Sequence, residues 1–307
     1  MSKLDLSIVI VNWNSLELTS AALSSLKEKT QGISYEVIVI DNGTTKDASA
    51  IELPARFPWI KFIANPDNRG FSKASNQGIH ASRGRYVLLL NSDTIQIENA
   101  LGESVKYMDE HPHLGALGIR HLNDDAERTT QASFFDFPRP WLEILGLVGL
   151  SGRRRSVLPV ESLERDVDWV CGSFLMVRRQ CLEQAGTLDE RFFIYDEDID
   201  WCLRARKSGW RVRYWPGVSM IHLGSASRPF MRDKTFSHFR SHLSYMRKHH
   251  SIVLAALYYG VMSLRLTGAT VLQALYCLIG RASIVELRER YERQKQFILL
   301  QSSSSGC

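Results

Sequence analysis

The densest group of carboxylates in the sequence is the acidic run Asp196-Glu197-Asp198-Ile199-Asp200. One or two carboxylates in the first turn of a helix complement the helix dipole. Four carboxylates within five residues also repel one another, which raises the pKa of some of them. A raised pKa suits a general base that must take a proton from a hydroxyl group. We therefore favour a catalytic role for this run over helix capping alone.

Asp93 is a candidate metal ligand. It follows Asn91 and Ser92 at the end of the apolar run 86–90, where a carboxylate can hold Mg²⁺ or Mn²⁺ together with substrate phosphates. Such a cation neutralises charge on a departing diphosphate. Ser92 and Asp93 equally suit an Asx-turn or the start of a helix. For Asp93 alone that structural alternative is favoured, and the presence of Asp41 shifts the balance towards a site.

Two further segments could bind a nucleotide. Asp41 follows the apolar run 37–40 and could accept hydrogen bonds from a nucleobase or ribose. The turn signal that follows Asp41 is compatible with this, because the turn would present the carboxylate. Asn68-Arg69-Gly70-Phe71 opens a predicted helix, where Gly70 permits close backbone approach and the helix N-terminus favours anions.

Two other positions are ambiguous from the sequence. His222, after the apolar run 218–221, is either a metal ligand or a satisfied core histidine, and alone the core histidine is favoured. Cys171-Gly172-Ser173 is either a bend in a strand or a tight loop beside an acceptor.

The elements that must position these residues alternate between short β-branched runs and helical patterns, as in βαβ units around a parallel sheet. The pattern predicts strands at 7–11, 35–40, 60–64 and 86–90, helices at 15–29 and 71–82, a helix from the acidic run to 208, and a strand at 210–215 that stops at Pro216. Ligands bind at the carboxyl ends of such strands. Three polar clusters lie there, at 12–14, 41–43 and 91–94, and predict one site at one edge of the sheet.

Bulk composition limits the class of protein. With 307 residues and 44% hydrophobic content, the chain can form one large domain with appendages and is neither disordered nor fibrous. The net charge of +5 suits an anionic partner such as a phosphorylated substrate or a lipid surface. The five cysteines lack CxxC spacing, which favours reduced buried thiols. The N-terminal apolar run is too short for a secretion signal, so we expect a cytoplasmic protein.

The C-terminal part differs in composition. Between 251 and 280 the only charged residue is Arg265, with 14 uncharged residues before it and 15 after it. A membrane span needs about 20 apolar residues. The sequence predicts either an interfacial helix or short re-entrant hairpin with residues 247–250 at the lipid head groups, or a packed pair of helices. The expected division is a domain at 1–245 with a nucleotide-binding half (1–120) and an acceptor and catalytic half (165–225), a helical extension at 246–300, and a disordered tail at 301–307.

Taken in order, these segments resemble the family 2 inverting glycosyltransferases of GT-A fold, and within them the bacterial rhamnosyltransferase-like branch. The resemblance spans roughly residues 6–225 and rests on the segments 8–14, 39–43, 68–76, 89–93, 171–173, 192–200 and 221–222. It implies an α/β fold of GT-A type, Rossmann-like, with a mostly parallel sheet flanked by helices and a C-terminal helical extension.

The resemblance also implies residue roles. Asp198 would be the catalytic base, and Asp93 and His222 would hold Mg²⁺ or Mn²⁺. Asn91 stands where the family's metal motif has its first aspartate. The residues expected at the nucleotide-sugar are Asn12, Asn14, Asp41, Asn68, Gly70, Phe71, Asn76, Asn91 and Ser92. Those expected on the acceptor side are Cys171, Gly172, Ser173, Glu197, Asp200 and Trp201.

The activity implied is transfer of a sugar in a single displacement, with inversion and without an enzyme nucleophile. The expected donor is dTDP-rhamnose, with galactose, galactofuranose or glucose donors on dTDP or UDP as alternatives. The acceptor would be a saccharide or a polyprenyl-diphosphate-linked saccharide for cell-surface polysaccharide such as O-antigen, with peripheral contact to the inner face of the membrane and no nucleic acid partner. A sugar-phosphate nucleotidyltransferase would need a Gly-rich phosphate loop, which 12–15 is not, and a non-catalytic binding protein would lack Asp93 and Asp198.

Overall fold

The computed structural model describes residues 4–147, 163–224, 234–278 and 291. The chain forms two compact units, one of residues 1–137 with 157–232 and one of residues 138–156 with 233–307. Each unit is described by itself.

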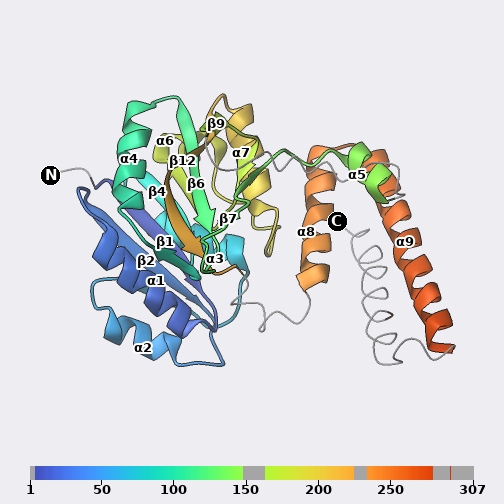
Figure 1. The fold of residues 1–307 in the computed structure, drawn as a ribbon, viewed down its shortest axis with the longest axis horizontal. Helices are drawn as coiled ribbons and strands as arrows, with labels where there is room; N and C mark the ends of the chain where they lie inside the picture. Colours follow the sequence, from blue (N-terminus) through green and yellow to red (C-terminus); the bar gives the residue numbers. More distant parts are fainter. Residues whose placement is uncertain (1–3, 148–162, 225–233, 279–290, 292–307) are drawn as a thin grey trace. The chain divides into compact units, whose positions relative to one another are not determined.

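The first unit is built on a mixed sheet with helices packed around it (Figure 1). The strand order is β3-β2-β1-β4-β11-β6-β12-β5. The strands on this path are β3 (Lys61–Asn65), β2 (Tyr35–Asn42), β1 (Leu6–Asn12), β4 (Tyr86–Asn91), β11 (Phe174–Arg178), β6 (Leu114–Leu122), β12 (Arg211–His222) and β5 (Thr94–Gln96). The first four are mutually parallel, as are β6 and β12, whereas β11 runs antiparallel between β4 and β6. Short strands β7 (Thr130–Gln131) and β9 (Arg165–Asp166) pair with β6 and β12, and β8 (Phe134–Phe135) pairs with β10 (Trp169–Val170).

Helices cover both faces of this sheet, which explains why its central strands are apolar on both sides. Alternate residues of β1 and β4 enter two separate cores: Ile8 belongs to the cluster with α1 and α4, and Val9 to the cluster with α3, α6 and α7. These helices are α1 (Leu16–Lys29), α3 (Phe71–Ala81), α4 (Ala100–Glu110), α6 (Arg179–Ala185) and α7 (Glu197–Lys207), with α2 (Ser49–Arg56) after β2. The predicted α/β fold is confirmed.

The predicted end of a strand at Pro216 is wrong. β12 continues to His222, with a register shift between Trp215 and Ser219 in its pairing with β6. Proline has no backbone N–H to donate to a neighbouring strand. At a bulge the residue need not donate such a hydrogen bond, so the strand can continue through Pro216. This continuation carries His222 to the carboxyl end of the sheet.

The second unit contains α5 (Pro140–Leu147), α8 (Lys234–His249) and α9 (Ile252–Leu278). Leu243 and Met246 of α8 form an apolar cluster with Ala255, Tyr258 and Met262 of α9. α9 is one continuous helix through position 265, so the alternative of a re-entrant hairpin is wrong. The boundary between the first unit and the C-terminal part of the second falls after residue 232. The sequence analysis placed this boundary at residue 245. The expected disordered tail and the end of the extension lie outside the described residues.

Candidate active site

The polar clusters predicted for the strand ends lie next to one another in the sheet. Asn12 at the end of β1 is in register with Asp41 of β2, and Val11 is in register with Asn91 of β4. The backbone N–H of Asn91 donates to the carbonyl of Ser173 at 3.2 Å. This bond joins the end of β4 to the loop 171–173.

Asp41 is held by its neighbours at the end of β2. Its Oδ1 accepts hydrogen bonds from Asn12 Nδ2 at 2.7 Å and from Thr44 Oγ1 at 2.5 Å. Asn12 Oδ1 in turn accepts from Ser15 and Thr19, and Asn12 is fully buried. The amide of Asn12 is occupied by protein partners, so Asn12 positions Asp41 and does not itself reach a donor, contrary to the prediction.

Asn14 shapes the loop after β2. It adopts a left-handed backbone with φ of 51°, which asparagine tolerates better than most residues. Its Oδ1 accepts the N–H groups of Thr45 and Lys46, both at 2.9 Å. Asn14 Nδ2 is buried and meets no hydrogen-bond acceptor among the described residues. The Nδ2 group of Asn14 can therefore donate a hydrogen bond to a ligand bound at the strand ends.

The loop before α3 is organised by Asn42, which lies in the predicted polar cluster 41–43 but was given no role of its own. Asn42 Nδ2 donates to Asn68 Oδ1 at 3.0 Å and to the Gly70 carbonyl at 3.3 Å, and its Oδ1 accepts the N–H of Arg69 at 3.1 Å. Asn68 Oδ1 also accepts the N–H of Gly70. Asn68 and Gly70 thus lie beside the end of β2, close to Asp41.

Gly70 and Phe71 join this loop to the segment that leads into the acidic run. The N–H of Phe71 donates to the carbonyl of Phe193 at 2.6 Å. Gly70 has a φ of +84°, and a Cβ there would lie 2.7 Å from Phe193. A side chain at position 70 is therefore excluded by backbone conformation and by contact with Phe193.

Three predicted site residues have structural roles instead. Asn76 is 2% exposed and exchanges hydrogen bonds with the backbone of Leu188 through both ends of its amide. Asp200 is fully buried and forms an ion pair with Arg204. Trp201 is 1% exposed, and its indole N–H donates to the Gly186 carbonyl at 2.9 Å. These residues are held in the core, so none of them is available to a substrate.

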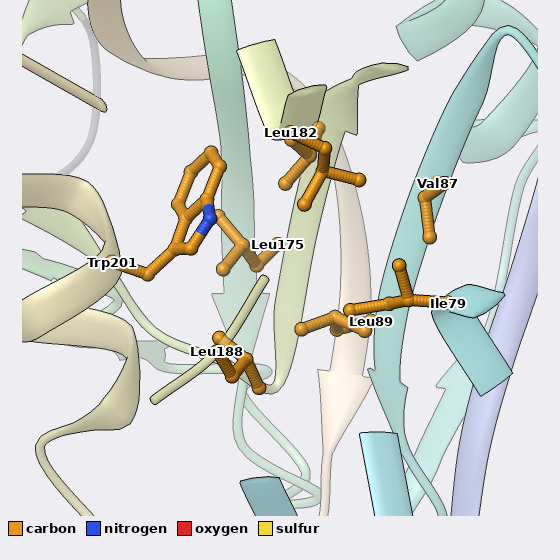
Figure 2. A pocket seen from close by; sticks show the side chains of 8 residues that line it. Ile79, Val87, Leu89, Leu175, Leu182, Leu188 and Trp201 are labelled. Atoms are coloured by element: carbon orange, nitrogen blue, oxygen red, sulfur yellow. The ribbon is translucent and has the colours of Figure 1, made fainter. Parts of the chain in front are cut away.

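Figure 2 shows the surroundings of Trp201, a small pocket between the sheet and helices α3, α6 and α7. Its lining is entirely aliphatic apart from the indole: Ile79, Val87, Leu89, Leu175, Val177, Leu182, Leu188 and Trp201. A ligand site needs polar groups that fix orientation, so this pocket belongs to the core.

The candidate metal ligands Asp93 and His222 face each other. His222 Nε2 lies 3.3 Å from Asp93 Oδ1, and the Asp93 carbonyl accepts the N–H of Leu223 at 2.9 Å. Two ligand atoms at about 2.1 Å from one cation would lie about 3 Å apart. The pair therefore fits two ligands of a divalent cation. No group of three or more His, Cys, Asp or Glu side chains gathers in the part of the chain that the structure describes.

Gln131 of β7 fixes the orientation of His222 and was not predicted. Gln131 Nε2 donates to Asn123 Oδ1 at 3.1 Å, so Oε1 is the end that faces His222. His222 Nδ1 lies 2.5 Å from that oxygen and donates to it. Nε2, the other ring nitrogen, then faces Asp93, as in a histidine that binds a metal through Nε2 and donates its Nδ1–H to a neighbour.

His121 of β6 is a second histidine in this region. Its ring lies 5.7 Å from that of His222, and its Nδ1 lies 3.4 Å from Ser173 Oγ. Burial, with His222 nearby, lowers the pKa of His121 to about 3, which keeps the ring neutral. His121 Nε2 has no hydrogen-bond partner among the described residues. Sequence reasoning missed it because a single histidine within a strand carries no spacing signal.

Asp198 lies against the loop 171–173 at the start of α7. Its Oδ2 accepts the N–H of Gly172 and its Oδ1 that of Ile199, both at 2.9 Å. Burial raises the pKa of Asp198 to about 6, and Asp196 adds to the rise, while the Gly172 bond opposes it. Burial, with Asp198 beside it, also raises the pKa of Glu197 well above its usual value. Burial therefore shifts the pKa values of two adjacent carboxyl groups of the run upward.

The turn that leads into α7 holds these carboxylates in an unusual backbone. Tyr195 and Asp196 adopt successive left-handed conformations, with φ of 72° and 63°. Such residues cost about 1–3 kcal/mol each and cluster at functional sites. Burial raises the pKa of Cys171, which lies beside Asp198, and this favours its thiol form.

Comparison with known proteins agrees with this geometry. The profile of Glycosyl transferase family 2 matches residues 7–185, more than half of the chain. Rhamnosyltransferase WbbL of Escherichia coli (strain K12) is 27% identical over 225 residues, which cover 70% of this chain and 83% of WbbL. The N-acetylglucosaminyl-diphospho-decaprenol L-rhamnosyltransferase of Mycobacterium tuberculosis is 28% identical over 228 residues, 67% of this chain and 71% of that protein.

Two further similarities concern length and fold. The chain spans only 27% of the uncharacterized protein y4gI of Sinorhizobium fredii, to which it is 25% identical. The mannosyltransferase PcManGT of Pyrobaculum calidifontis shares the fold, with a TM-score of 0.56 at 14% identity over 98% of this chain and 88% of that one. The strand order, the site and the matched profile lead to one conclusion: the chain belongs to glycosyltransferase family 2 and is a nucleotide-sugar-dependent glycosyltransferase of GT-A fold.

Proposed function

We propose that the enzyme transfers rhamnose from dTDP-rhamnose to a saccharide acceptor, with inversion, in a single displacement. The observation that carries the reaction type is the position of Asp198, whose carboxylate is fixed by Gly172 and whose pKa is raised to about 6. The two rhamnosyltransferases at 27% and 28% identity support the choice of sugar. Galactose, galactofuranose and glucose donors on dTDP or UDP are the alternatives within the same reaction.

Asp198 would act as the general base. A carboxylate with a pKa of about 6 is ionised at neutral pH and is a stronger base than an ordinary aspartate. The N–H groups of Gly172 and Ile199 orient both of its oxygens. An acceptor hydroxyl bound beside the loop 171–173 would lose its proton to Asp198 as it attacks the sugar. The leaving diphosphate would depart on the opposite face, so no covalent enzyme intermediate is needed.

Asp93 and His222 would hold Mg²⁺ or Mn²⁺, which when bound would neutralise charge on the leaving diphosphate. Their 3.3 Å separation and the orientation of His222 by Gln131 support this assignment. PcManGT was solved in complex with GDP-Man and Mn²⁺. With Asn91 in place of a second carboxylate, the donor's phosphates would complete the coordination shell.

The acceptor is proposed to be a polyprenyl-diphosphate-linked saccharide at the cytoplasmic face of the membrane, in cell-envelope polysaccharide synthesis. The support is the name of the Mycobacterium tuberculosis relative, which describes a decaprenol-linked acceptor. Donor binding would use Asp41, Asn68 and Asn14 at the strand ends, where a nucleotide would meet both the Asp41 carboxylate and the unpartnered Asn14 amide.

A donor screen tests the proposal. The purified protein is incubated with nucleotide-sugars and Mn²⁺ or Mg²⁺, with and without a polyprenyl-linked acceptor, and products are followed by mass spectrometry. We expect turnover of dTDP-rhamnose, loss of metal-dependent turnover in Asp93→Ala, and loss of transfer with retained dTDP binding in Asp198→Asn. Transfer from a different donor alone would reject rhamnose, and full activity of Asp198→Asn would reject the base.

A further inference from the structure

The long helix α9 of the second unit has two unlike faces. Ala255, Tyr258, Tyr259 and Met262 are buried against an apolar cluster that includes Leu243 and Met246 of α8. Seven aliphatic side chains of α9 are each more than half exposed, and five of them lie on the side away from this face: Val253, Leu257, Leu264, Val271 and Leu275. Their spacings of four and seven residues place them along one side of the helix. We call these five residues the α9 stripe.

The formal charges of α8 and α9 themselves are all positive. The segment 234–278 carries five Lys or Arg residues and no Asp or Glu. Arg240 and Arg247 of α8, seven residues apart, are both exposed, and so is Arg265 of α9. An apolar stripe on a helix pair whose formal charges are all positive is complementary to a bilayer with anionic head groups, because interfacial binding combines apolar burial with electrostatic attraction.

The packing of α9 decides between lying on a membrane and spanning it. Length and composition alone would allow Ile252–Leu275 to cross a bilayer. However, α9 packs against α8 as far as Met262, and α8 bears arginines and histidines that cannot enter hydrocarbon. After Arg265 the sequence has 15 uncharged residues before Arg281, fewer than the roughly 20 apolar residues that a span needs. Neither half can span alone.

We propose that the α9 stripe binds the surface of an anionic lipid bilayer, with α9 lying in the plane of the interface and Arg240 and Arg247 near the head groups. This inference goes beyond the proposed sugar transfer, because it concerns the second unit and needs no donor or acceptor. A second copy of the chain is the competing occupant of the stripe.

Vesicle sedimentation of the full-length protein tests this. We expect it to sediment with vesicles that contain phosphatidylglycerol, less with pure phosphatidylcholine, and less at high salt. The double variant Leu264→Glu/Val271→Glu should bind roughly tenfold more weakly or worse, since each large aliphatic side chain contributes on that order. Ile51→Glu is the matched control: Ile51 is 77% exposed in α2 of the first unit, so its variant should bind like the wild type.

A second variant separates charge from apolar contact. Arg240→Gln/Arg247→Gln should lose severalfold in binding to anionic vesicles and little in binding to neutral ones. The proposal is overturned if the wild type stays in the supernatant with both vesicle types, or if Leu264→Glu/Val271→Glu binds unchanged. It is also overturned if light scattering shows a wild-type dimer that this variant dissolves while neither protein binds vesicles. None of these outcomes depends on which nucleotide-sugar the enzyme uses.

Discussion

At the scale of single residues, the acidic run separates into side chains with different tasks. Asp198→Asn should lower kcat by about 10²–10⁴, the usual contribution of a general base. Glu197→Gln should be far milder, because the raised pKa of Glu197 favours the neutral acid that glutamine imitates. Steady-state kinetics on both variants checks this. Equal losses in the two variants would contradict the assignment of Asp198 as the base.

The pKa of Asp198 also predicts a pH dependence. Since the base must be ionised, activity should rise with pH through about 6 and level off above it. Stability should move the other way, because an acid whose pKa is raised on folding resists ionisation in the folded state. The loss of folding stability caused by this resistance is absent at pH values below the ordinary aspartate pKa. It grows between that value and about 6 and is complete above 6. Melting curves of wild type and Asp198→Asn across this range should therefore diverge as pH rises, with the variant relatively more stable.

Gln131 offers a test of the metal pair without changing a ligand. Gln131→Met removes the acceptor for His222 Nδ1 while keeping a similar size. Loss of such a partner typically costs 10–100-fold in metal affinity. The Mn²⁺ concentration for half-maximal activity should rise by that order, whereas kcat at saturating Mn²⁺ should recover. Gln131→Glu, which keeps an acceptor oxygen, is the control. An unchanged metal dependence in Gln131→Met would argue against His222 as a ligand.

The sequence predicted the residues that carry charge and missed those that orient them. Asp41, Asp93 and Asp198 stand at the ends of recognisable elements, so their positions could be inferred. Asn42 and Gln131 act through hydrogen bonds to residues 23–28 and 91 positions away, and no local pattern encodes such pairs. Asn76 and Trp201 were predicted to contact substrate but are buried in the core. This error arose because a family motif contains residues that pack as well as residues that react.

At the scale of elements, strands with uninterrupted aliphatic runs were predictable and strands with glycines were not. β6 carries Gly115 and Gly118, which suggest a break in the strand. In the structure a Cβ at Gly118 would lie 2.6 Å from Val170, so the glycine allows β10 to approach β6 closely. The same limit applies to β12, whose Pro216 suggests an end but occupies a bulge. Neither contact is visible before the sheet is assembled.

The contact of Gly70 and Phe71 with Phe193 gives a prediction for which the chain offers a matched control. Gly70→Ala and Gly32→Ala both place a side chain at positive φ, which costs about 1 kcal/mol. Only Gly70 has a neighbour in the way, since a Cβ there would lie 2.7 Å from Phe193 whereas Gly32 has nothing within 4 Å. Gly70→Ala should therefore lower the free energy of unfolding by more and raise the KM for donor, which Gly32→Ala should leave unchanged. Urea unfolding measures the first effect and titration with the sugar donor measures the second. If the two variants changed the free energy of unfolding and the KM equally, the contact with Phe193 would have no part in either effect.

At the scale of the whole molecule, the two proposals together assign sugar transfer to the first unit and bilayer binding to the second. The proposed sugar-transfer site, with Asp93 and Asp198, lies in the first unit, and the α9 stripe lies in the second. Binding a surface that also holds the acceptor raises the local concentration of enzyme and lipid without any new contact at the site. The gain should appear only when the acceptor is in a bilayer.

Leu264→Glu/Val271→Glu should therefore separate two activities of the same protein. Transfer to a water-soluble acceptor should match the wild type, because the substituted side chains are exposed on α9, far in sequence from every residue of the site. Transfer to a polyprenyl-linked acceptor in anionic vesicles should fall about tenfold, in step with the loss of vesicle binding. High salt should reduce the wild type on vesicles and have less effect in solution, since the cations of α8 contribute only at the charged surface. If both substrates lost activity together, the substitutions would be acting on the site through the fold, and the stripe would have no separate part in catalysis at the membrane.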